Sequence, residues 1–215
     1  FQDRIPSVAA FQLPFLFTDY DQARAALYEG DYGYQLIGDV ASLGFTVNGI
    51  VPDGFRVMTM NKKVESLADM HGLKMRMPNL EIMVEIGNYL GFAVTPMSMT
   101  EVFSALEQGV IDGQENPPST IRSQGWYEIQ DYLLVSNHVF TSLFLCVNND
   151  FYNSLDSELQ NILDEVIDET CAQIWDTAQT QAQEDLDYMS SEGGIEVYEP
   201  SDSFRQEMVE ATAPM

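Results

Sequence analysis

Apolar and polar positions in the middle of the chain switch from a strand period to a helix period. Leucine and methionine alternate with two cations through residues 73–77, which predicts a strand that turns Arg76 away from the face covered by the methionines. Pro78 ends this strand, and Asn79 occupies the position of a helix N-cap. Apolar positions then recur every three or four residues through residues 82–90, which predicts a helix.

The same arrangement repeats in the next segment. Ser98 and Glu101 have the spacing of a capping box at the start of a second helix. A short strand, Val110–Asp112, is expected to lead to Asn116, whose amide is held in one direction by the two prolines that follow it. If the two strands are parallel neighbours joined by helices, Arg76 and Asn116 face a shared crevice. An arginine beside the start of a helix can bind a carboxylate, although the same geometry also occurs in proteins with a purely structural role.

The remaining segments also alternate between the two periods, which predicts an α/β protein. Turn residues at Asn48-Gly49 and at residues 52–54 are expected to divide the segment that begins at Phe45 into two short strands. A uniformly apolar run predicts a buried strand from Val139 to Val147. Residues 156–189 carry an apolar stripe that predicts one helix of roughly 50 Å at about 1.5 Å per residue. Further helices are expected at residues 19–30, 32–43, 66–72, 120–130 and 202–212, and a last strand at 194–200.

Length and composition are those of a folded globular protein. The 215 residues, 45% hydrophobic and 20% charged, can bury a core as one large or two small domains. No apolar run approaches the roughly 20 residues that span a bilayer. The chain opens at Phe1 without a signal peptide, so we expect a mature or trimmed chain.

The net charge of −25, from 34 acidic and 9 basic residues, argues against nucleic acid and anionic lipid as partners, because phosphate binding needs clustered lysine and arginine. An anionic ligand is repelled at long range, but screening over a Debye length of about 8 Å leaves local arginines to decide binding. A solvated surface that favours solubility explains the acidity. The presence of only three lysines also fits adaptation to saline surroundings.

No residue pattern indicates catalysis or a metal centre. Cys146 lies in an apolar strand and Cys171 on the apolar face of the long helix, so buried thiols are expected, with a disulfide as the alternative in an exported chain. His71 and His138 are isolated and are expected in turns or packing. The chain has no metal-ligand spacing, no glycine-rich phosphate loop and no nucleophile with a placed base. We therefore expect neither an enzyme nor a cofactor.

Four segments together resemble a known family: FQLPFLFTDYDQAR, GLKMRMPN, PMSMTEVFSALEQGVIDGQENP and YEIQDYLLVSNHVF. They are similar to the solute-binding P subunit, dicarboxylate-binding type, of tripartite ATP-independent periplasmic (TRAP) transporters, in order over essentially the whole chain. The resemblance implies a two-lobed fold of the periplasmic-binding-protein kind, with hinge strands and a long helix crossing both lobes. It also implies that the family's first strands and helices precede Phe1, so that part of the first lobe is absent.

The resemblance further implies a division into lobes. Lobe I is expected to contain the segments 1–53 and 142–181, and lobe II the segments 54–141 and 182–209. Residues 210–215 are expected to begin a C-terminal helical tail.

The resemblance assigns ligand contacts to particular residues. Arg76 matches the arginine that pairs with the ligand carboxylate, and Asn116 is expected to hold the same end of the ligand. Arg56 matches a second arginine that reaches the ligand in parts of the family, although the residues alone favour an arginine that extends to water.

Three further contacts are expected. Asn79 would add a hydrogen-bonding group at a helix start, and Met99 would cover the apolar side of the ligand. Leu143 would border the cleft. A leucine there, in place of a polar group, favours a ligand with few hydroxyl groups.

The resemblance implies an extracytoplasmic protein that captures a small organic acid and delivers it to a TRAP membrane permease. Such a protein is expected in the periplasm, after removal of a signal peptide, as a monomer that closes over its ligand without chemistry. The alternative is a ligand-sensing module of a receptor on the same two-lobed fold.

Overall fold

The computed structural model describes residues 5–215. The chain folds into two compact units, and it passes from one to the other several times. The first unit contains Phe1–Gln12, Leu16–Gly54 and Phe140–Thr180, and the second contains Leu13–Phe15, Phe55–Val139 and Gln181–Met215.

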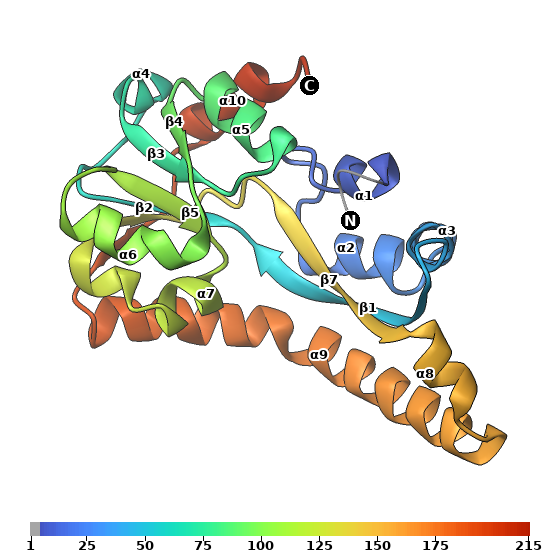
Figure 1. The fold of residues 1–215 in the computed structure, drawn as a ribbon. Helices are drawn as coiled ribbons and strands as arrows, with labels where there is room; N and C mark the ends of the chain where they lie inside the picture. Colours follow the sequence, from blue (N-terminus) through green and yellow to red (C-terminus); the bar gives the residue numbers. More distant parts are fainter. Residues whose placement is uncertain (1–4) are drawn as a thin grey trace. The chain divides into compact units, whose positions relative to one another are not determined.

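The second unit is built on a six-stranded mixed sheet in the order β4-β3-β5-β2-β6-β8, of which Figure 1 labels β4, β3, β5 and β2. Its strands are β2 (Val57–Met60), β3 (Lys74–Met77), β4 (Ala93–Pro96), β5 (Gly113–Asn116), β6 (Tyr132–Leu134) and β8 (Glu196–Tyr198). β3 pairs in parallel with both β4 and β5, whereas β2 runs antiparallel to its two neighbours. The parallel pairing of the strands that carry Arg76 and Asn116 is therefore confirmed.

Helices cover both faces of this sheet, as Figure 1 shows. On one face the buried methionines of β2 and β3 pack against α4 (Leu67–Met70), α5 (Glu81–Tyr89) and α10 (Asp202–Thr212). On the other face α6 (Met99–Glu107), α7 (Pro118–Ser123), the 3-10 helix η1 (Trp126–Ile129) and the last turns of α9 (Ser157–Ser191) enclose a second apolar cluster. Since side chains alternate between the faces of a strand, β2, β6 and β8 contribute to both clusters.

The first unit contains a two-stranded sheet of β1 (Phe45–Phe55) and β7 (Phe140–Asn148). Its helices are α1 (Pro6–Ala10), α2 (Tyr20–Leu27), α3 (Asp31–Ala41), α8 (Asn149–Ser154) and residues 157–180 of α9. Trp175 packs α9 against both strands of this sheet. Its indole Nε1 donates to the carbonyl of Ile50 on β1 at 2.9 Å, and its ring stacks on Phe140 of β7.

The predicted long helix is confirmed as α9, which has 35 residues. It begins in the first unit and ends in the second, since the division falls between Thr180 and Gln181. In the described part of the chain, no helix combines the length and the hydropathy that a membrane span requires.

Two expected strand boundaries are wrong. The segment from Phe45 to Met60 does form two strands, but the first, β1, runs unbroken through the expected turns to Phe55, and the second is β2. The turn residue Gly49 stays in the strand because it packs against α9, where an added Cβ would lie 2.3 Å from Cys171 Sγ. Likewise Val110–Asp112 is not a strand: the N–H of Val110 still bonds to Ala105 in α6, and β5 begins at Gly113.

Two further expectations need correction. The helix expected at residues 120–130 is divided by Gly125, whose φ of +68° separates α7 from η1. The strand β7 is buried only at Phe140 and Thr141, and the residues after Thr141 are half-buried or exposed.

Candidate functional site

The carboxyl ends of β3 and β5 form the centre of the candidate site. Arg76 on β3 lies directly opposite Gln114 on β5, and Asn116 follows two residues later on the same face. The chain leaves β3 into α5 on one face of the sheet and leaves β5 into α7 on the other. Ligands of α/β sheets bind where neighbouring connections diverge in this way.

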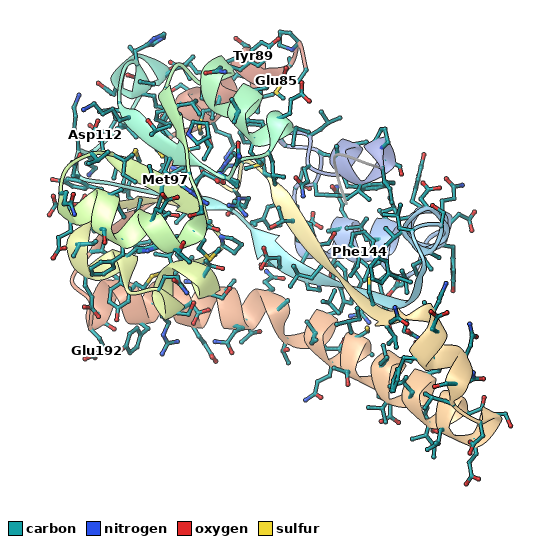
Figure 2. The ribbon with its side chains drawn as sticks, in the orientation of Figure 1. Glu85, Tyr89, Met97, Asp112, Phe144 and Glu192 are labelled. Atoms are coloured by element: carbon teal, nitrogen blue, oxygen red, sulfur yellow. The ribbon has the colours of Figure 1, made fainter. Side chains whose placement is uncertain are left out.

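Arg76 is a buried cation, with 3% of its surface exposed. Its Nε and Nη2 donate to the carbonyl oxygen of Met97 at 3.1 and 2.9 Å, and Met97, labelled in Figure 2, joins β4 to α6. Among residues 5–215, no carboxylate lies within 4.0 Å of this guanidinium, and no residue there accepts a hydrogen bond from its Nη1. Burial lowers the pKa of Arg76; the negative charge of Glu115 opposes this shift, and the positive charge of Arg56 adds to it.

Arg56 has the opposite environment, because a carboxylate neutralises it. Its Nη2 donates to Glu115 Oε1 at 2.9 Å and to the Glu115 carbonyl at 2.8 Å, while its Nε donates to Oε2 of the same residue. Both side chains are buried. Burial acts to raise the pKa of Glu115, but the charge of Arg56 and the neighbouring His138 outweigh it, so the net shift is downward.

His138 completes the buried group around Glu115. Its Nε2 lies 3.5 Å from Glu115 Oε2, and its Nδ1 shares a hydrogen bond of 2.8 Å with the hydroxyl of Ser136. His138 is thus a packing residue inside the second unit, fully enclosed by protein.

A chain of hydrogen bonds extends from Arg56 to Thr59 through two side-chain amides. Arginine can only donate, so the 3.0 Å bond from Arg56 Nη2 identifies its partner atom on Asn116 as Oδ1. Asn116 Nδ2 therefore faces Gln114 and donates to Oε1 at 2.8 Å. Gln114 Nε2 in turn donates to the Thr59 hydroxyl at 2.9 Å. One N–H of Asn116 Nδ2 remains, and no residue in the described part of the chain accepts it.

The other predicted contacts are more exposed. Asn79 is exposed, and its expected role as a helix N-cap is wrong, because Leu80 is the N-cap of α5 and bonds back to Pro78. Met99 is the first residue of α6 and is 44% exposed. Leu143 belongs to the first unit, where its side chain is 53% exposed on β7.

Several residues of this network were not found from the sequence: Glu115, Gln114, Thr59, Ser136 and the carbonyl of Met97. Glu115 and Gln114 lie on β5, which is polar yet fully buried. A buried polar strand has no apolar alternation to reveal it. The capping box of Ser98 and Glu101, by contrast, is confirmed: Glu101 accepts the N–H of Ser98 at 3.0 Å.

Neither a metal centre nor a disulfide is found in the described residues. No group of three His, Cys, Asp or Glu side chains within residues 5–215 is arranged to hold a metal ion. Cys146 and Cys171 are free thiols, and burial raises the pKa of both. Cys146 is only partly buried, which differs from the expectation of two buried thiols.

Comparison with known proteins gives one family match over residues 1–215, to "Bacterial extracellular solute-binding protein, family 7". A C4-dicarboxylate-binding periplasmic protein of Rhodobacter capsulatus is 30% identical over 95% of this chain. A TRAP periplasmic solute-binding protein of Haemophilus influenzae, solved with bound L-gulonate, is 32% identical, covers 99% of this chain and 69% of its own, and has a TM-score of 0.88. A TRAP periplasmic solute-binding protein of Shewanella oneidensis, solved with bound succinate, is 27% identical and has a TM-score of 0.93; the match covers 100% of this chain and 70% of that one.

The matched relatives are longer than this chain. The chain spans 62%, 61% and 64% of the length of three curated relatives that each match at least 95% of it.

Proposed function

The chain belongs to family 7 of the bacterial extracellular solute-binding proteins, and on that premise we propose that it binds a small organic acid in the periplasm and delivers it to a TRAP membrane permease. The family match and the α/β fold confirm the resemblance seen in the sequence. Because the chain spans less than two thirds of the curated relatives, the ligand and permease of the whole protein belong to the proposal.

The observation that carries this proposal is the buried charge of Arg76, which forms no ion pair with a carboxylate among residues 5–215. Removing an ion from water costs several kcal/mol unless an opposite charge or hydrogen bonds offset the loss. Arg56 receives that compensation from Glu115, whereas Arg76 has only the Met97 carbonyl. A ligand carboxylate would supply the missing charge, and each charge-assisted bond to it contributes about 1.5 to 3 kcal/mol.

The atoms available beside Arg76 are hydrogen-bond donors. Arginine has no acceptor, and the Asn116 amide turns its Oδ1 toward Arg56 and keeps one N–H of Nδ2 uncommitted. An ionised carboxylate only accepts hydrogen bonds, so it matches this set. A primary amide or an ammonium group carries N–H donors, and these would face the N–H donors of Arg76 and Asn116. The donor set therefore supports an anionic ligand group.

The other predicted contacts keep secondary roles in the proposal. Arg56, neutralised by Glu115, would act through hydrogen bonds instead of net charge. Asn79 and Met99, both exposed near the ends of β3 and β4, would contact the rest of the ligand, and Leu143 is a further proposed contact. We propose that the protein acts as a monomer, catalyses no reaction and needs no cofactor.

A thermal-shift screen of the full-length protein tests the proposal. The panel contains acids bound in solved structures of relatives, namely L-gulonate, galactonate, succinate and orotic acid, each beside its primary amide. A ligand at a hundred times its Kd stabilises the folded protein by about 2.7 kcal/mol. We expect at least one acid, and no amide, to raise the melting temperature. Equal shifts with acids and amides, or none with any acid, would refute the carboxylate site.

A further inference from the structure

Gln114 is the neutral residue of β5 that pairs in register with Arg76, the buried cation of β3. It is fully buried and lies opposite Arg76 in the parallel pairing of β3 and β5. The next residue, Glu115, faces the other way and neutralises Arg56. On β5 the carboxylate of Glu115 thus pairs with Arg56, whereas the residue opposite Arg76 is the neutral amide Gln114.

Gln114 also determines what Asn116 offers to a ligand. Arg56 fixes Oδ1 of Asn116 from one side, and Gln114 Oε1 accepts one N–H from the other. Gln114 is itself held by Thr59, whose hydroxyl accepts from Nε2. With Oδ1 and one N–H occupied, the Asn116 amide cannot turn over without breaking two bonds, and it presents a single N–H.

We infer that Gln114 is a positioning residue of the carboxylate site, an inference that rests on the proposed function. Its Oε1 orients the Asn116 amide, and its lack of charge leaves the charge of Arg76 to the ligand. A glutamate of the same shape at this position would serve as an internal counter-ion and occupy the role of the ligand carboxylate.

Two substitutions at this position separate charge from hydrogen bonding. Gln114→Glu keeps the shape and an acceptor for Asn116 but adds a carboxylate beside Arg76, so Kd is expected to rise by about a hundredfold or more. Gln114→Met keeps the volume but removes the acceptor, and Kd is expected to rise by about tenfold, the worth of one neutral hydrogen bond. The ligand-free Gln114→Glu protein is expected to melt no lower than Gln114→Met, because its new charge pairs with Arg76.

The link to Thr59 is tested by a double-mutant cycle. Thr59→Val removes the acceptor for Gln114 Nε2 and keeps the side-chain shape. If Thr59 acts through Gln114, this substitution weakens binding in the wild type and has no further effect on Kd in the Gln114→Met background. Equal effects in both backgrounds would show that Thr59 acts on packing alone, and the inferred chain from Thr59 to Asn116 would be wrong.

The experiment is calorimetric titration of the full-length variants with L-gulonate and with succinate. Gln130 offers a matched control, since it is a buried glutamine of the same unit that bonds only to the carbonyl of Ile129 among the described residues. Gln130→Glu and Gln130→Met are expected to keep Kd within about threefold of the wild type, a change below 1 kcal/mol. Folded Gln114 variants that bind like the wild type would overturn the inference and leave the proposed function intact. A wild-type protein that binds none of the four acids of the thermal-shift panel would instead refute the proposed function, and the inference with it.

Discussion

Replacing Arg76 by methionine removes the charge on which the proposed site depends and keeps most of the side-chain volume. Arg76 has Nη1 free for a ligand, and its Nη2 and Nε are already held by the Met97 carbonyl. Two charge-assisted bonds to a carboxylate, at about 1.5 to 3 kcal/mol each, amount to roughly 3 to 6 kcal/mol. At 1.4 kcal/mol per tenfold change in Kd, we expect affinity to fall by at least about a hundredfold.

The same substitution is expected to change the stability of the ligand-free protein much less than its affinity for the ligand. Arg76→Met deprives the Met97 carbonyl of its two donors, which costs about 1 to 3 kcal/mol, but it also removes a buried charge that no carboxylate of the described residues offsets. These terms oppose each other, so we expect a melting temperature close to that of the wild type. Arg76→Lys is also expected to bind poorly, because an ammonium group does not reproduce the planar fork of arginine.

The assay is isothermal titration of the full-length protein with the acid that gives the largest thermal shift. Lys74→Met is the matched control: it removes one positive charge from the same strand, at an exposed position, and is expected to leave Kd within about twofold of the wild type. The reasoning is refuted if Arg76→Met binds as tightly as Lys74→Met, or if it unfolds at low temperature, since a structural role would then explain the arginine.

Three further predictions concern stability. Glu115→Gln removes the carboxylate that pairs with the buried Arg56 and is expected to lower the free energy of unfolding by about 3 to 5 kcal/mol in urea titrations; a loss below 1 kcal/mol would contradict the assigned ion pair. The folded-state pKa of Glu115 is lowered, so its stabilisation is present above the unfolded value near 4.5 and is lost as pH falls through the folded value. Glu115→Gln should therefore show a smaller acid-induced loss than the wild type, and equal slopes would count against this linkage. Gly49→Ala forces a methyl group against Cys171 Sγ and is expected to destabilise the protein by about 1 to 3 kcal/mol in thermal melts, whereas the matched change Gly38→Ala meets no atom within 4 Å and should not.

The methionine strand shows what periodicity predicts well. Met75 and Met77 are fully buried and Arg76 points to the other face, as the alternation in the sequence indicates. The helices after it also lie close to their expected bounds, because their apolar stripes and caps are local signals. The parallel pairing of β3 with β5 meets the condition under which the sequence places Arg76 and Asn116 at a shared crevice.

The interior of β5 shows where this reasoning stops. Its residues Gln114, Glu115 and Asn116 are buried and polar, so neither hydropathy nor strand propensity identifies them as a central strand. The expected strand began three residues too early, at Val110, which follows α6 and still hydrogen-bonds to Ala105 of that helix. The partner of Arg56 lay in the misread segment. Glu115 on β5 and Arg56 are about sixty positions apart in the sequence, so their ion pair depends on the tertiary structure and leaves no local sequence signal.

A crystal structure of the full-length protein with its bound acid tests the central claim most directly. We predict that the ligand carboxylate lies within hydrogen-bond distance of Arg76 and of Asn116 Nδ2, while Arg56 keeps its pair with Glu115. A bound acid held elsewhere, with Arg76 still bonded only to the Met97 carbonyl, would contradict the account.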